Sequence, residues 1–135
     1  MHRAHHKGHF EFHACPISHG DIPTQECFDQ HPLTFISDTN DWAVRHEEYP
    51  ERAYLEPDNW QLSYKFQLPD NLTGNLVLLQ WYYITANSCT PKGYDSYDFP
   101  ADFNPGSVSE CGAIPPDGRG VPEQVSDYYL YSWFS

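Results

Sequence analysis

The run Leu76-Val-Leu-Leu-Gln-Trp-Tyr-Tyr-Ile-Thr-Ala86 says most about how this chain folds. Apolar residues occupy both of its alternating faces, a pattern typical of a strand that is covered on both sides. The run is eleven residues long, whereas a helix that crosses a bilayer needs roughly 20 apolar residues. We therefore expect the central strand of a sheet here.

A second strand is predicted over 60–68, where apolar and polar residues alternate strictly. Such alternation indicates one buried face and one wet face. The turn signal Pro69-Asp70-Asn71 follows this strand and precedes the central one. The apolar positions of the predicted strand are Trp60, Leu62, Tyr64, Phe66 and Leu68.

A third strand is predicted over 8–14, where apolar and polar residues again alternate. We expect His9 and His13 to face outward on the polar side of this strand. Because proline cannot donate to a sheet, Cys15-Pro16 is expected to end it. The apolar residues that share the inner face are Phe10, Phe12 and Ala14.

The remainder of the chain shows no sustained helical period. Residues 38–58 are acidic and irregular, and residues 90–124 are rich in proline and read as a long loop. The chain therefore reads as an all-β sandwich with long loops. We expect residues 1–124 to form the domain, in partial form, and residues 125–135 to be a loosely ordered aromatic tail.

Composition narrows the range of partners. The 135 residues are enough for one domain and carry a formal charge of -12. Such a surface repels phosphate backbones and anionic lipids, so we expect neither nucleic acid nor membrane as a partner. A neutral polymer such as a polysaccharide would not be repelled, although the charge is explained equally well by solubility alone.

Four cysteines suit two disulfides, and no Cys-x-x-Cys zinc pattern is present: Cys15, Cys27, Cys89 and Cys111. A Cys15–Cys27 bridge would close a short loop and add roughly 3 kcal/mol in the chain-entropy model. Disulfides require an oxidising compartment, yet no signal peptide follows Met1. A chain whose beginning has been lost would reconcile the two observations.

The opening run His2-Arg-Ala-His-His-Lys-Gly-His-Phe-Glu-Phe-His-Ala-Cys-Pro16 places five histidines within twelve residues. Histidine is the commonest protein ligand for copper and zinc. The cluster is therefore either a metal site or an accident of composition. The helical His-Glu-x-x-His arrangement of metalloproteases is absent.

Four strings together resemble a known family. They are Gly8-His-Phe-Glu-Phe-His-Ala-Cys-Pro16, Tyr64-Lys-Phe-Gln-Leu-Pro-Asp-Asn-Leu-Thr73, Leu78-Leu-Gln-Trp-Tyr-Tyr-Ile-Thr-Ala-Asn-Ser-Cys89 and Gly120-Val-Pro-Glu-Gln124. From about His5 to Gln124 the chain resembles the C-terminal two thirds of the chitin-binding type-4 domain. That domain is the catalytic domain of a class of lytic polysaccharide monooxygenases.

The resemblance implies an immunoglobulin- or fibronectin-III-like β-sandwich that is secreted and binds crystalline chitin or cellulose on a flat face. It also implies one copper ion, held by an N-terminal histidine and by a second histidine just before the Gly-aromatic-Glu-Phe strand. The second histidine corresponds to His6, in preference to His5 or His9. Gln80 matches a polar group near the copper, with a purely structural glutamine as the equal alternative.

Two departures from the family pattern bear on activity. The chain starts with Met1, whereas the copper site needs an N-terminal histidine. After Gln124 the family's aromatic residue and cysteine are missing, so one of Cys89 and Cys111 is expected to lack its usual partner. Catalysis by this chain is therefore an open question.

Three functions stay open. The first is a copper-dependent polysaccharide monooxygenase, and the second is a carbohydrate-binding module without catalysis. The third is an incomplete gene product without stable function. We expect a monomeric, extracellular protein that acts on or binds an insoluble polysaccharide. Candidate carbohydrate-binding aromatic residues are Trp42, Tyr94 and Tyr97, although anchoring of loops to the core is the favoured alternative for them.

Overall fold

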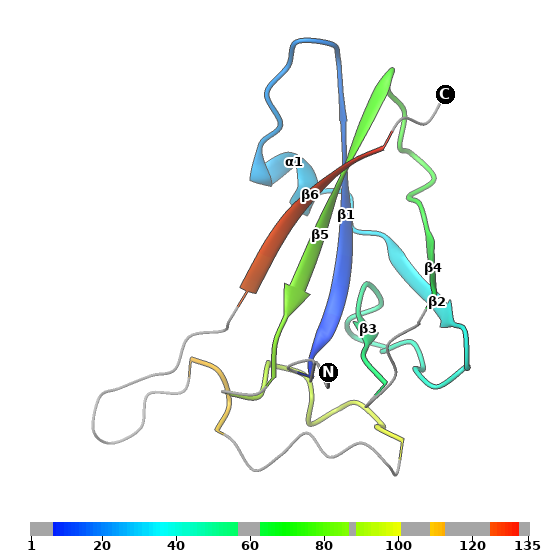
Figure 1. Ribbon diagram of the computed structural model, residues 1–135, viewed down its shortest axis with the longest axis vertical. Coiled ribbons are helices and arrows are strands. Elements are labelled where there is room, and N and C mark those ends of the chain that lie inside the picture. Colours follow the sequence, from blue (N-terminus) through cyan, green and yellow to red (C-terminus); the bar gives the residue numbers. More distant parts are fainter. Residues whose placement is uncertain (1–6, 57–62, 87–88, 101–108, 113–124, 133–135) are drawn as a thin grey trace, which may run out of the picture.

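The computed structural model describes residues 7–56, 63–86, 89–100, 109–112 and 125–132 (Figure 1). In this part of the chain the fold is mostly β, with two antiparallel sheets and one short helix. The elements are β1 (His9–Ile17), α1 (Gln25–Asp29), β2 (Thr34–Asp38), β3 (Ala53–Tyr54), β4 (Tyr64–Gln67), β5 (Leu76–Ile84) and β6 (Val125–Ser132).

The larger sheet has the strand order β3-β1-β5-β6, and β5 lies inside it. Residues His9 to Ile17 of β1 pair antiparallel with β5, from Ile84 back to Leu76. On its other side, β5 pairs antiparallel with β6. Figure 1 shows β1 and β5 running side by side. The prediction of a central strand is confirmed.

β1 continues to Ile17, past the end predicted for it. Pro16 lies opposite Val77 in the register with β5. β3 pairs with β1 only at His9 and Phe10. Among the described residues, the edge of β1 that faces away from β5 therefore has no paired strand at Pro16. Proline is tolerated at such an edge, because no N–H is needed there for pairing.

The two sheets pack through aromatic rings. The smaller sheet pairs β2 with β4. The Phe10 and Tyr64 ring centroids are 5.4 Å apart, and those of Phe12 and Phe66 are 5.0 Å apart. The predicted inner face of the 8–14 strand is thus confirmed. The part of the 60–68 prediction that precedes residue 63 lies outside the described residues.

Residues 125–132 form β6 and pair with β5 from Ile84 to Val77. The prediction of a loosely ordered tail is wrong for this segment. Without β6, this edge of β5 would present unpaired backbone donors and acceptors. Pairing of β6 satisfies them, which explains why an aromatic segment without a turn signal joins the sheet.

α1 lies in a part of the chain where the sequence shows no sustained helical period. Its N-cap is Thr24, whose hydroxyl accepts a hydrogen bond from the Cys27 N–H at 3.2 Å. With five residues, α1 is too short to leave a helical period in the sequence. The Cys15–Cys27 disulfide ties it to β1. No helix among the described residues is long and apolar enough to cross a membrane.

The second disulfide joins Cys89 to Cys111. These two cysteines are therefore partners of each other, and the prediction of two disulfides is confirmed. Two backbone hydrogen bonds lie next to this disulfide. The Thr90 N–H donates to the Ser109 carbonyl, and the Cys111 N–H donates to the Thr90 carbonyl, both at 2.8 Å. The two segments are thus held by covalent and backbone bonds together.

Candidate functional site

The chain enters β1 through a tight turn at Lys7 and Gly8. Their φ angles of 56° and 97° both lie in the left-handed region. A Cβ on Gly8 would overlap the carbonyl oxygen of Ile84. Only glycine therefore lets the chain pass this close to β5. His6, the residue before this turn, lies outside the described residues.

Two hydrogen bonds hold the turn in place. The Tyr83 hydroxyl donates to the Lys7 carbonyl at 2.8 Å, and the Leu55 N–H donates to the Gly8 carbonyl at 3.2 Å. A left-handed conformation costs a residue such as Lys7 about 1 kcal/mol. Such strain persists only where the surroundings fix the backbone. Here β5 and the residue after β3 provide that support directly after His6.

A buried polar cluster lies on the face of β1 that was predicted to face solvent. His9 is fully buried and Glu11 is 8% exposed. The prediction of an outward-facing His9 is wrong, because side chains from distant segments cover this face. Tyr94 reaches His9, and the Arg52 Nε lies 3.5 Å from a Glu11 carboxylate oxygen.

The hydrogen-bond geometry fixes where the protons lie in this cluster. An ionised carboxylate and a carbonyl only accept. His9 Nε2 therefore donates to Glu11 at 3.0 Å, and His9 Nδ1 lies 2.7 Å from the Tyr94 hydroxyl, a group that can donate or accept. His13 faces an acceptor on both sides, with Glu11 at 3.1 Å and the Phe28 carbonyl at 3.2 Å. His13 is therefore an imidazolium.

The pKa shifts agree with this assignment. Burial lowers the pKa of His9 below 6.5 despite its bond to Glu11. Burial also opposes the charged form of His13, but the hydrogen bond and charge of Glu11 outweigh it and raise the pKa of His13. For Glu11 burial acts to raise the pKa, yet hydrogen bonds from His13 and His9 hold it far below its usual 4.5.

Gln80 lies opposite His13 in the register, whereas Ile84 lies opposite His9. Gln80 and Ile84 are four residue steps apart along the strand, or about 13 Å. Gln80 is fully buried, and its side-chain amide pairs with that of Gln25 through bonds of 2.9 and 3.2 Å. The pairing with Gln25 is what the structural alternative expects of this residue. The pocket beside it is lined by Glu11, His13, Gln25, Asp29, Gln80 and Tyr82.

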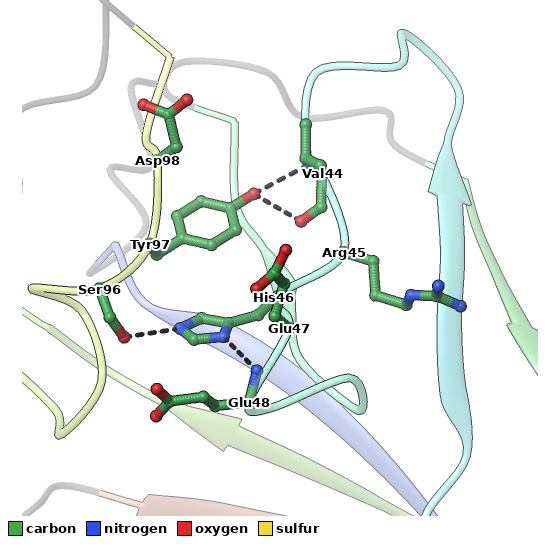
Figure 2. Close-up of a pocket in the computed structure, with 8 residues that line it drawn as sticks. All are labelled: Val44, Arg45, His46, Glu47, Glu48, Ser96, Tyr97 and Asp98. Atoms are coloured by element: carbon green, nitrogen blue, oxygen red, sulfur yellow. Dashed lines mark hydrogen bonds between the residues drawn. The ribbon is translucent and has the colours of Figure 1, made fainter.

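The three candidate carbohydrate-binding aromatic residues belong to one core cluster. Tyr94 and Tyr97 are 3% and 8% exposed, and Trp42 is partly buried against the same cluster. The Tyr97 ring stacks on Tyr54 at 3.9 Å. Its hydroxyl accepts from the Val44 N–H and donates to the Val44 carbonyl (Figure 2). The structure thus places these rings as loop anchors, and we no longer assign them to a carbohydrate surface.

His46 has no predicted role, and it lines the pocket of Figure 2 together with Ser96. The Glu48 N–H donates to His46 Nδ1 at 3.0 Å, so the proton lies on Nε2, which donates to the Gly93 carbonyl at 2.9 Å. The Ser96 hydroxyl donates to that same carbonyl at 3.1 Å. His46 therefore cannot act as a base toward Ser96, and this pair is not a nucleophile site.

Comparison with known proteins assigns the family. Residues 1–103 match the family model described as lytic polysaccharide mono-oxygenase, cellulose-degrading. The chain belongs to the lytic polysaccharide mono-oxygenase family.

A solved structure supports the same fold for this mono-oxygenase family member. It is a lytic polysaccharide monooxygenase AA15 from Thermobia domestica in the Cu(I) state, with 24% sequence identity and a TM-score of 0.54. The match covers 96% of this chain and 53% of that chain. This chain thus spans about half the length of the protein it matches. Among curated proteins, no match was found.

Membership of the lytic polysaccharide mono-oxygenase family implies a copper ion, which needs nitrogen donors with a free lone pair. His9, His13 and His46 do not qualify, because both ring nitrogens of each are engaged in hydrogen bonds. Across the described ranges, no group of three or more histidine, cysteine or acidic side chains forms a metal site. The described residues do not fit a complete copper site.

The sequence did not predict two features of this family member. They are the buried polar cluster around Glu11 and the entry turn, which is the turn at Lys7 and Gly8. The spacing of His9, Glu11 and His13 placed them on one face, but it did not show that the face is covered. The sequence did not predict the contact of Arg52 with Glu11, because Arg52 lies in an irregular segment. The contact of the Tyr83 hydroxyl with the turn at Lys7 and Gly8 depends on the register of β5 with β1.

Proposed function

We propose that this chain is a polysaccharide-binding member of the lytic polysaccharide mono-oxygenase family, directed to chitin or cellulose. It is extracellular and monomeric, and its two sheets form an immunoglobulin- or fibronectin-III-like sandwich. The observation that carries this proposal is the strained turn at Lys7 and Gly8, which is fixed by Tyr83 and Leu55. A rigid support beside His6 suits a residue whose ring must be held in one place.

Charge supports a neutral partner. The formal charge of -12 opposes docking on nucleic acid or anionic lipid, but not on an uncharged polymer. Chitin and cellulose carry no charge at neutral pH. A flat polymer surface is therefore compatible with this chain, whereas an anionic one is not.

His6 is the copper ligand in this proposal. Copper bound there would supply the redox chemistry for oxidative opening of a glycosidic bond. Its other donors would come from outside the described residues, so we derive no catalytic step. His6 would contribute one imidazole nitrogen, held in place by the turn that follows it.

The binding part of the proposal is tested by pull-down of the purified chain on chitin and on cellulose beads. We expect depletion from the supernatant with at least one polymer, and release by soluble oligomers of the same sugar. The proposal fails if a chain that unfolds cooperatively stays in solution with both polymers.

The copper part is tested by Cu(II) titration followed by electron paramagnetic resonance. The comparison is between the wild type, His6→Ala and the neighbouring control His5→Ala. We expect the nitrogen-coordinated signal of the wild type to persist in His5→Ala and to be lost in His6→Ala. Equal spectra for the two variants would contradict a specific role for His6.

A carbohydrate-binding module without catalysis is the second candidate. It is favoured by the engagement of both ring nitrogens in His9, His13 and His46, which leaves none of them to complete a copper site. The two candidates are separated by adding copper and a reductant to the bound chain. Oxidised oligosaccharides identify the mono-oxygenase, and binding without them identifies the module.

A further inference from the structure

The segment between β4 and β5 carries the motif Asn71-Leu72-Thr73, which matches the acceptor pattern for N-linked glycosylation. Asn71 and Thr73 are exposed, whereas Leu72 between them is partly buried. Leu72 packs against the core cluster formed by Ala14, Leu33 and Val77. The middle residue thus anchors the motif, and the two residues that define it face solvent.

The backbone of this segment is fixed without either acceptor side chain. The Leu72 N–H donates to the Pro69 carbonyl at 3.1 Å. At Gly74 the chain passes so close to Pro16 that a Cβ would lie 3.0 Å from the Pro16 Cβ. The Asn71 and Thr73 side chains make no hydrogen bond to other described residues. A large substituent on Asn71 would therefore break no contact seen in the fold.

The disulfides place the chain in a suitable compartment. All four cysteines are paired, as Cys15–Cys27 and Cys89–Cys111. Two disulfides in one domain indicate an oxidising secretory route. This step rests on the extracellular location given under the proposed function.

The position of the motif keeps it away from the proposed copper end. β5 begins at Leu76, opposite Ile17, and ends at Ile84, opposite His9. The eight residue steps between these two ends span about 26 Å. Figure 1 shows the start of β5 near the top of the larger sheet and the start of β1 at the lower end of that sheet. A glycan at the β4–β5 turn would leave the surface around the entry turn open.

We propose that Asn71 carries an N-linked oligosaccharide in the secreted protein. The donor is an oligosaccharide linked to a lipid diphosphate. The side-chain amide nitrogen of Asn71 attacks the anomeric carbon of the first sugar and forms a C–N bond. The bond from that carbon to the diphosphate oxygen breaks, the amide loses one proton, and the lipid diphosphate leaves. No oxidant or reductant is required.

The test expresses the full chain behind a cleavable secretion leader in insect cells. Both the secreted and the cell-retained protein are analysed by intact mass. We expect a mass increase of one core oligosaccharide, removed by peptide N-glycosidase with conversion of Asn71 to aspartate. Thr73→Ala is expected to lose the added mass and Thr73→Ser to keep it.

Asn75→Gln is the matched control. Asn75 is exposed in the same segment, but Val77 stands where the acceptor hydroxyl would be needed. The control is expected to keep the full mass increase. The proposal is overturned if neither the secreted nor the retained wild type carries sugar at Asn71.

Binding to polysaccharide beads separates this proposal from the proposed function. We expect equal binding by the glycosylated wild type and the unglycosylated Thr73→Ala, because the motif lies far from the entry turn. Sugar at Asn71 with no binding contradicts the proposed function alone. Binding without sugar contradicts the glycosylation proposal alone.

Discussion

The two halves of β1 are held by different physical means. At its start, Gly8 lies in close contact with the Ile84 backbone, and hydrogen bonds to main-chain carbonyls fix the turn at Lys7 and Gly8. In its middle, a buried carboxylate at Glu11 lies between two imidazoles and a guanidinium. The first half depends on shape and the second on charge. The halves should therefore respond to different changes.

This contrast locates the rigidity that the proposed function needs. Beside His6, the turn is held by two hydrogen bonds to main-chain carbonyls, one from the Tyr83 hydroxyl and one from the Leu55 N–H. The charged middle of β1 instead links the strand to α1, through the bond from His13 to the Phe28 carbonyl. Changes to either half are therefore best compared with matched controls elsewhere in the chain.

The largest effect is expected for Glu11→Gln. Removal of one partner from a buried ion group leaves uncompensated charge and costs about 4 kcal/mol. The glutamine keeps the size, but its single carbonyl oxygen cannot replace the two carboxylate oxygens that contact His9 and His13, and it carries no charge opposite Arg52. Urea unfolding measures the loss of stability.

Glu47→Gln is the control, because Glu47 is exposed and such surface changes stay within about 0.5 kcal/mol. If the two variants lose similar stability, charge does not hold the middle of β1. The comparison between the two halves would then collapse.

The next effect is expected for Gly8→Ala, with Gly20→Ala as its matched control. The two glycines have nearly equal φ angles of 97° and 96°, but nothing lies within 4 Å of a Cβ on Gly20. The control therefore isolates the backbone cost of about 1 kcal/mol. Gly8→Ala adds the overlap with Ile84, for a total of about 3 kcal/mol. Equal losses in thermal unfolding would show that β5 does not confine the turn.

The sequence predicted the strands better than their surroundings. Alternation at period two identified the inner face of β1 and the exposure of Lys65 in β4, because local geometry sets which side chains share a face. It could not show what lies over the other face of β1. Arg52 and Tyr94 reach that face from irregular segments far along the chain, and no local sequence pattern predicts such contacts. The same limit applies to β6, whose role depends on an open edge of β5.

The candidate site was predictable only in part. The His6-Lys-Gly8 motif indicated where the family places a ligand, and Gly8 has the backbone conformation that only glycine adopts readily. The position of Gln80 was inferred from a motif, but distance along an antiparallel pair depends on register. The register places it opposite His13 instead of Gly8. Register is set by all pairings of a strand together, so one motif could not fix it.

A smaller effect is expected for Tyr83→Phe. The change removes the hydroxyl that donates to the Lys7 carbonyl and should cost about 1 kcal/mol. The control is Tyr49→Phe, whose hydroxyl makes no hydrogen bond to other described residues. We expect the control to be nearly neutral in urea unfolding. A neutral Tyr83→Phe would mean that contact with Ile84 alone fixes the entry turn.

The smallest effect is the pH dependence of stability, which belongs to the charged half alone. The pKa of His13 is raised in the folded state, so its contribution is complete below 6.5 and is lost as the pH rises through the folded-state pKa. The pKa of His9 is lowered, so its contribution is present above 6.5 and is lost as the pH falls. The two histidines therefore oppose each other on either side of this value.

Unfolding free energies measured between about pH 5 and pH 8 test the opposite pH dependences expected for His13 and His9. In His13→Gln, the loss of stability at alkaline pH should disappear, while the loss of stability at acid pH should remain. Gly8→Ala should keep both, because it acts only on the half held by shape. If Gly8→Ala changed the pH profile as His13→Gln does, the two halves of β1 would be coupled, and the support beside His6 would depend on charge after all.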